Sequence, residues 1–81
     1  MDKIIVSYEK EGDSAEIELQ IVEAEDIQAA RKELNDFARI RTDCIVEYSI
    51  IESDFLSAKI TGNGISEAIL GELEAAGWRW M

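Results

Sequence analysis

The sequence predicts an α+β fold in the order ββαββα, with an antiparallel sheet and two helices packed on one of its faces. Four stretches alternate apolar and polar residues with the two-residue period of half-buried strands. Two other stretches repeat apolar residues at spacings of three and four, the period of an amphipathic helix. Because the strands come in pairs joined by short turns, we expect antiparallel hairpins and a second sheet face that is wet.

The first hairpin is predicted at the start of the chain. In its first strand, the side chains of Ile4, Val6 and Tyr8 point one way, whereas those of Ile5, Ser7 and Glu9 point the other way. The segment EGDS, residues 11–14, has the composition of a turn. In the second strand the apolar residues alternate with polar ones and share one face; they are Ile17, Leu19 and Ile21.

The first helix is expected from about Glu25 to Arg39. Its apolar stripe consists of Ile27, Ala30, Leu34 and Phe37. Glu25 and Asp26 lie at its start, and Arg39 and Arg41 lie at its end. This distribution suits the helix dipole, which favours negative charge at the N-terminus and positive charge at the C-terminus.

The second hairpin is predicted after this helix. In its first strand the residues on one face are Cys44, Val46, Tyr48 and Ile50. The segment ESD, residues 52–54, is expected to turn the chain. The next strand runs from Phe55 to Ile60, and its inward residues are Leu56, Ala58 and Ile60.

The second helix is expected to begin near Asn63 or Ser66 and to stop at Gly77, since a glycine can adopt the left-handed conformation that closes a helix. Its inward residues are Ile65, Ile69, Leu73 and Ala76. In residues 78–81 a short closing strand would place Trp78 and Trp80 on one face. Two roles are open for this pair: completion of the core, or an anchor for a dimer or another partner.

All 81 residues are expected to form one compact domain, because the chain has no proline, linker or low-complexity segment. Shifted by 41 residues, DKIIVSYEKEGD aligns with DCIVEYSIIESD, and a two-residue deletion then aligns the two helices. This alignment allows two degenerate ββα units, at about 1–40 and 42–81. Two unrelated hairpin–helix units would give the same few matches by chance.

The composition excludes several classes of function. A net charge of −10 opposes direct binding to nucleic acid or to anionic membranes, both of which attract Lys and Arg. No apolar run approaches the roughly 20 residues of a membrane span, and the N-terminus lacks the pattern of a signal peptide. The single cysteine, Cys44, cannot form an internal disulfide. A reducing cytoplasm is therefore the expected location.

No catalytic, cofactor or metal site is predicted. Histidine, the commonest general base and metal ligand, is absent. Cys44 lies on the inward face of its strand and is expected in the core. TGNG, residues 61–64, is expected to be a tight turn with an Asn cap. EKEGDSAEIE, which starts at Glu9, lacks the ligand pattern of a calcium loop. We therefore expect a binding protein and not an enzyme.

The charge is concentrated in residues 9–26, which hold eight acids and one base, a net −7 of the chain's −10. The acids are Glu9, Glu11, Asp13, Glu16, Glu18, Glu23, Glu25 and Asp26. In a strand, alternate side chains stand about 6.8 Å apart on one face. Phosphates two nucleotides apart on a nucleic-acid strand are separated by a similar distance along the helix axis, at roughly 3.4 Å per step. The acids are therefore expected to form a negative band on the hairpin. Such a band would attract a basic groove, although Glu is also common on any wet strand face.

In size, charge and α/β build, the chain resembles the small acidic proteins of bacteriophages and mobile elements that block nucleic-acid enzymes, including anti-CRISPR and anti-restriction proteins. The resemblance implies an inhibitor that mimics nucleic acid and occupies the basic groove of a bacterial defence or host complex. The eight acids would be its partner-binding residues. The alternative is a homodimeric structural or adaptor module that associates through a sheet edge or through Trp78 and Trp80, with acids that serve solubility.

Overall fold

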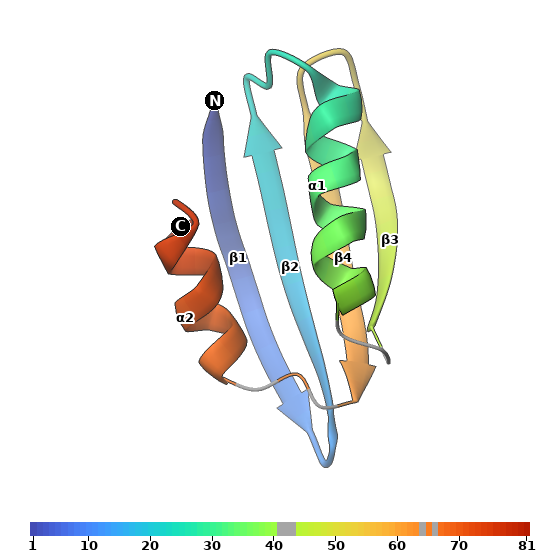
Figure 1. The fold of residues 1–81 in the computed structure, drawn as a ribbon, viewed down its shortest axis with the longest axis vertical. Coiled ribbons are helices and arrows are strands. Elements are labelled where there is room, and N and C mark those ends of the chain that lie inside the picture. The colour runs from blue at the N-terminus through green and yellow to red at the C-terminus, as the bar shows by residue number, and fades with distance from the viewer. Residues whose placement is uncertain (41–43, 64, 66) are drawn as a thin grey trace.

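The computed structural model describes residues 1–40, 44–63, 65 and 67–81 (Figure 1). In the described chain the elements are β1 Asp2–Glu11, β2 Ser14–Val22, α1 Ile27–Ile40, β3 Cys44–Ile51, β4 Leu56–Asn63, α2 Glu67–Ala75 and β5 Arg79–Trp80. The predicted α+β class and ββαββα order are confirmed, and the short closing strand is present as β5. Arg41 and Ser66, named above as helix ends, lie outside the described residues.

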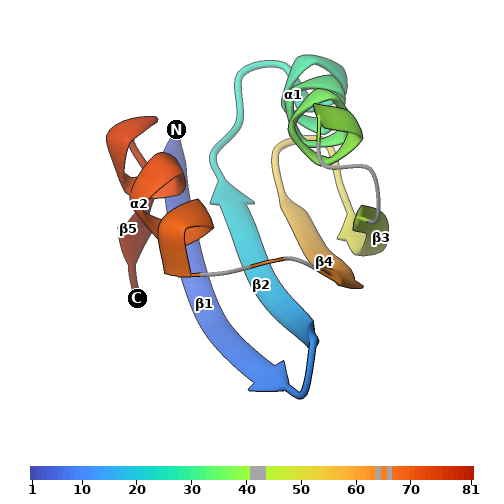
Figure 2. The same ribbon diagram turned by 60° about the horizontal axis from the view of Figure 1, so that its bottom comes forward.

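The strands form one sheet in the order β3-β4-β2-β1-β5. The four long strands are antiparallel, whereas β5 pairs with β1 in parallel, so the sheet is mixed. Both helices lie on the same face, α1 across β3 and β4 and α2 beside β1 (Figure 1 and Figure 2). We call the face that carries the helices the inner face and the uncovered one the outer face.

The core lies between the inner face and the helices. The inward residues of β2 and β4 predicted from the alternation are all buried, and so are Leu34 of α1 and Ile69 and Leu73 of α2. Cys44, Val46 and Tyr48 of β3 are partly buried against this cluster. Gly77 adopts a positive φ of 99° just past α2, in agreement with its predicted role as a helix stop.

Two β-bulges change the strand faces that strict alternation predicts. In β1 the register shifts between Ile5 and Ser7, so Ile5 and Tyr8 both lie on the inner face, opposite Leu19 and Ile17. The prediction that Tyr8 shares a face with Ile4 and Val6 is therefore wrong. A bulge places one extra residue in a strand, so every later side chain points to the opposite face from the one that alternation gives.

The second bulge lies in β3, between Tyr48 and Ile50. Beyond it Ile51, and not Ile50, pairs with the buried Leu56, while Ile50 pairs with Ser57 on the outer face. The prediction that Ile50 shares the inner face with Tyr48 is wrong for the same reason as in β1. Both long hairpins thus contain a bulge in their first strand.

The two hairpins are related by an approximate twofold axis through the centre of the sheet. Glu18 of β2 lies directly opposite Lys59 of β4 in the antiparallel register, and these residues are 41 positions apart, the shift of the sequence alignment. The axis relates the register of the β1–β2 hairpin to that of the β3–β4 hairpin, whereas the helices are placed differently, α1 across β3 and β4 and α2 beside β1 (Figure 1). A duplicated ββα unit would give this arrangement; the duplication itself stays a prediction.

Candidate functional site: an acidic outer face

The structure separates the eight acids of residues 9–26 into two groups. Five lie on or beside the β1–β2 hairpin and are called the hairpin acids: Glu9, Glu11, Asp13, Glu16 and Glu18. Glu23, Glu25 and Asp26 follow the other end of β2, which spans about 30 Å at roughly 3.4 Å per residue. The eight acids therefore lie toward the two ends of β2, with Glu23, Glu25 and Asp26 at its exit as expected.

The outer face carries the hairpin acids of β2. Because Ala15, Ile17 and Leu19 are buried, the intervening Glu16 and Glu18 point to the outer face. Glu9 of β1 lies directly opposite Glu16, which places two carboxylates side by side across the strands. The tip of the hairpin, with Glu11 and Asp13, extends past both helices (Figure 1).

An open hollow of about 740 Å³ lies on this hairpin. Its lining residues come from β1, β2 and β4, and they are Glu9, Lys10, Glu11, Ser14, Ala15, Glu16 and Thr61. Three hairpin acids therefore surround one concave surface with a single base, Lys10, among the lining residues. A cationic side chain placed in this hollow would approach several carboxylates at once.

Lys59 of β4 is a site residue that the sequence reasoning missed. Its Nζ lies 3.3 Å from Oε1 of Glu16 and 3.8 Å from Oε1 of Glu18. The hydrogen bond with Glu16, followed by the negative charge of Glu16, raises the pKa of Lys59 above its usual value; Glu18 and Glu47 add to this effect. Only the pairing of β2 with β4 brings Lys59 here, and nothing in the local sequence signals that pairing.

The second acidic group lies at the opposite end of the sheet, where the β2–α1 loop meets the β3–β4 turn. The Ala24 N–H donates a hydrogen bond of 2.8 Å to the Asp54 carbonyl oxygen, which joins these two segments. We call the acids of this region the far-end acids; they are Glu23, Glu25, Asp26, Glu52 and Asp54. Together with the hairpin acids they make both ends of the molecule negative.

Asp26 has a structural role within this group. Its Oδ1 accepts hydrogen bonds from the backbone N–H groups of Gln28, at 3.0 Å, and Ala29, at 3.2 Å. This is the geometry of a helix N-cap, which satisfies donors that the first turn of α1 leaves free. These hydrogen bonds explain why an acid lies at the start of this helix. Because Oδ1 of Asp26 already accepts hydrogen bonds from its own chain, this carboxylate is less available to a partner.

The two C-terminal tryptophans have different environments. Trp78 is only 4% exposed and belongs to the core, with the Lys3 ammonium 5.8 Å from its ring centroid. Lys3 also forms an ion pair of 2.9 Å with Glu33 of α1. Trp80 is 47% exposed, and its Nε1 donates a 3.0 Å hydrogen bond to Glu74. Of the two roles left open for the pair, Trp78 fills the core and Trp80 stays accessible.

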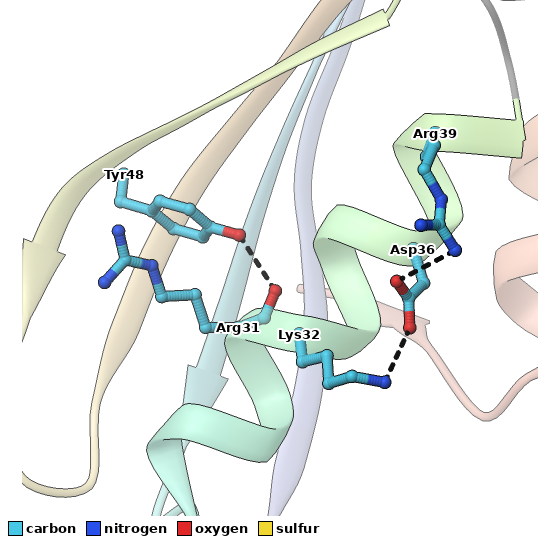
Figure 3. A network of polar contacts seen from close by, with 5 residues as sticks. All are labelled: Arg31, Lys32, Asp36, Arg39 and Tyr48. Atoms are coloured by element: carbon cyan, nitrogen blue, oxygen red, sulfur yellow. Dashed lines mark hydrogen bonds and ion pairs between the residues drawn. The ribbon is translucent and has the colours of Figure 1, made fainter.

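Helix α1 carries a polar network that faces away from the acidic outer face (Figure 3). The Tyr48 hydroxyl lies 3.0 Å from the Arg31 carbonyl oxygen, and the Arg31 guanidinium lies 4.8 Å from the Tyr48 ring centroid. Lys32 and Arg39 both form ion pairs with Asp36. Burial raises the pKa of Tyr48 above its usual value, although the charge of Arg31 opposes this shift. Within α1, the charges of Lys32 and Arg39 are thus partly balanced by Asp36.

Within the described part of the chain, no group of three or more His, Cys, Asp or Glu side chains is arranged to hold a metal ion. None of the helices described is both long and apolar enough to cross a membrane. Comparison with known protein families, with curated proteins and with solved structures finds no match for this chain. The geometry of the outer face is therefore the basis for a functional proposal.

Proposed function

We propose that this protein is a non-enzymatic inhibitor that mimics nucleic acid and binds a basic nucleic-acid-binding groove. One observation carries the proposal: three of the hairpin acids, Glu9, Glu11 and Glu16, line an open hollow on the β1–β2 hairpin, and no helix covers the outer face of that hairpin (Figure 1). A groove lined with Lys and Arg for phosphate binding would be attracted to this surface by the same electrostatic steering.

The hairpin acids suit this role better than the far-end acids do. Glu16 and Glu18 stand on a paired strand with Lys59 within 3.3 Å and 3.8 Å of their carboxylates, so their backbone needs no ordering when a partner binds. At the far end, Asp26 is already occupied as a helix cap, and the acids lie on the segments that connect strands and helix. Within the proposal, Lys59 is a positioning residue for the carboxylates.

The proposed partner is a nucleic-acid-binding complex of a bacterial defence system or of a host, as for anti-CRISPR or anti-restriction proteins. The proposed setting is a phage or another mobile element that expresses the protein in the bacterial cytoplasm. There the chain would meet its target under reducing conditions, which agree with a single cysteine.

The test is a pull-down from bacterial lysate with three forms of the tagged protein. The hairpin variant carries Glu9→Gln, Glu11→Gln and Asp13→Asn. The matched control carries Glu25→Gln, Glu52→Gln and Asp54→Asn, which removes the same charge at the far end. We chose these side chains because none of them forms an ion pair among the described residues.

We expect the wild type and the control to capture an identified nucleic-acid-binding protein at low salt and to release it when duplex DNA is added. The hairpin variant should capture at least about ten-fold less, because each missing carboxylate weakens the electrostatic attraction. Equal capture by the hairpin variant, or a loss confined to the control, would refute the hairpin as the binding site. Capture that duplex DNA does not displace would refute mimicry.

The homodimeric structural or adaptor module remains the second candidate. It would use the exposed Trp80 or the free edge of the sheet, since Trp78 lies in the core. The mass of the wild type in sedimentation at rising concentration tests it, with Trp80→Ser as the variant. A monomer at all concentrations would exclude this candidate.

A further inference from the structure

Strand β3 forms one edge of the sheet. It pairs with β4 on one side, and no strand of the described chain lies on its other side. Residues 45–48 pair with β4 in unbroken register before the bulge at Ser49, so the other side of this stretch presents a regular row of backbone groups. Proteins usually protect such edges with charged side chains, Pro, bulges or a covering segment. Residues 45–48 contain no Lys or Pro, their single charged side chain is Glu47, and the bulge lies beyond them at Ser49.

The β3 edge is also unusually apolar. Of the seven large apolar residues that are well exposed in the described chain, three lie on this strand: Ile45 at 62%, Ile50 at 48% and Ile51 at 40%. Ile45 and Ile50 point to the outer face, because they pair with Thr61 and Ser57 of β4. The opposite edge of the sheet differs, since β5 pairs with β1 at Ile4 and Ile5.

Glu47 lies between these two isoleucines on the outer face, directly opposite Lys59. Lys59 forms its ion pairs with Glu16 and Glu18, and among the described residues Glu47 has no ion-pair partner. A strand added to the β3 edge would therefore meet apolar, acidic and apolar side chains in turn. A basic side chain opposite Glu47, with apolar neighbours opposite Ile45 and Ile50, complements this pattern.

A second copy of the chain fits this edge poorly. In an antiparallel β3–β3 pair with Glu47 at the centre, the two Glu47 carboxylates would face each other, and like charges directly opposite are destabilising. In the neighbouring register of the same two strands, Glu47 of one copy would lie opposite the apolar Ile45 of the other, so it would gain no cationic partner. Each copy also carries a net charge of −10, which opposes self-association.

We propose that the β3 edge binds an extended segment of a basic partner protein as an additional strand, with Lys or Arg opposite Glu47. Main-chain hydrogen bonds to residues 45–48 would supply the affinity. The side chains of Ile45, Glu47 and Ile50 would supply the selectivity. The inference rests on the proposed function only in taking the partner to be cationic. It adds a second contact surface, separate from the hairpin acids.

The probe is a synthetic peptide, acetyl-Thr-Val-Thr-Lys-Thr-Val-Thr-amide, which carries one charge and two apolar residues on one strand face. A second peptide has the same side chains but N-methylated backbone amides, so it cannot donate hydrogen bonds to a sheet. A third has Glu in place of Lys. Binding to the full chain is followed by NMR shifts and hydrogen exchange of the backbone amides.

We expect the first peptide to shift the amides of residues 45–48 and to slow their exchange, and the N-methylated peptide to bind at least about ten-fold more weakly. Glu47→Lys should weaken binding of the Lys peptide about two- to five-fold and improve binding of the Glu peptide. Glu52→Lys, the same charge change in the adjacent turn, is the control and should change neither. Circular dichroism checks that both variants are folded.

Three results would overturn this inference. Equal binding of the N-methylated peptide, with shifts centred on the hairpin acids, would show electrostatic adsorption without strand addition. If millimolar peptide caused no NMR shift of the backbone amides, the β3 edge would not accept an additional strand. A dimer of the wild type alone, with slow exchange in residues 45–48, would show that a second copy occupies the edge. The lysate experiment depends on the hairpin acids, so either proposal can fail while the other stands.

Discussion

At the scale of single residues, Lys59 reduces the negative charge of the outer face. Its ammonium is shared by Glu16 and Glu18, and the shorter contact is to Glu16. The sequence showed that Glu16 and Glu18 point outward, because alternation with buried residues needs no knowledge of strand order. It could not show their partner, because Lys59 approaches them only through the pairing of β2 with β4.

This arrangement gives a prediction for the titration of Lys59. Glu16→Gln removes the first cause of its raised pKa, so the pKa should fall toward the usual value, and Glu18→Gln should lower it less. The pKa is read from the side-chain ε-carbon signal in NMR. A raised folded-state pKa stabilises the fold below the unfolded-state pKa, and this contribution is lost as pH rises through the folded-state value. Equal shifts in the two variants would contradict the unequal distances.

At the scale of elements, the sequence predicted the buried faces of regular strands and helices but did not predict the two β-bulges. The buried faces of β2 and β4 follow the alternation, and Ala30 and Leu34 of the predicted α1 stripe are buried. The bulges at Val6 and Ser49 left no signal, since β-branched and small residues on both sides fit either face. The length of β2 sets the distance between the hairpin acids and the acids that follow the strand.

The C-terminal element gives a prediction about the two tryptophans. Trp78→Ala should destabilise the protein by about 3–5 kcal/mol, because it removes a buried aromatic side chain from the core. Trp80→Ala should cost about 1 kcal/mol or less, since it loses one exposed hydrogen bond to Glu74. Urea unfolding measures both changes. If both variants lost a similar free energy of unfolding, the assignment of Trp78 to the core and Trp80 to the surface would be wrong.

At the scale of the whole molecule, charge follows the approximate twofold arrangement of the hairpins. The β1–β2 turn and the β3–β4 turn lie at opposite ends of a molecule 36 Å long, and acids are concentrated at both. The Debye length is about 10 Å at 0.1 M salt, so the two ends are largely screened from each other there. Repulsion within each end is the larger electrostatic cost to folding, because neighbouring carboxylates are closer than this length.

This distribution predicts that added salt stabilises the protein. Between about 10 mM and 300 mM NaCl, repulsion among the acids is screened, and the midpoint of thermal unfolding should rise by several degrees, on the order of 1 kcal/mol. Salt also weakens the ion pairs described here, but exposed pairs of this kind contribute little. The hairpin variant and its far-end control should each unfold at a higher temperature in low salt and respond less to added salt. If the midpoint of thermal unfolding fell as salt was added, the ion pairs within the fold would outweigh the repulsion among the acids. The acids would then be largely neutralised by the protein's own bases and would attract a basic partner only weakly.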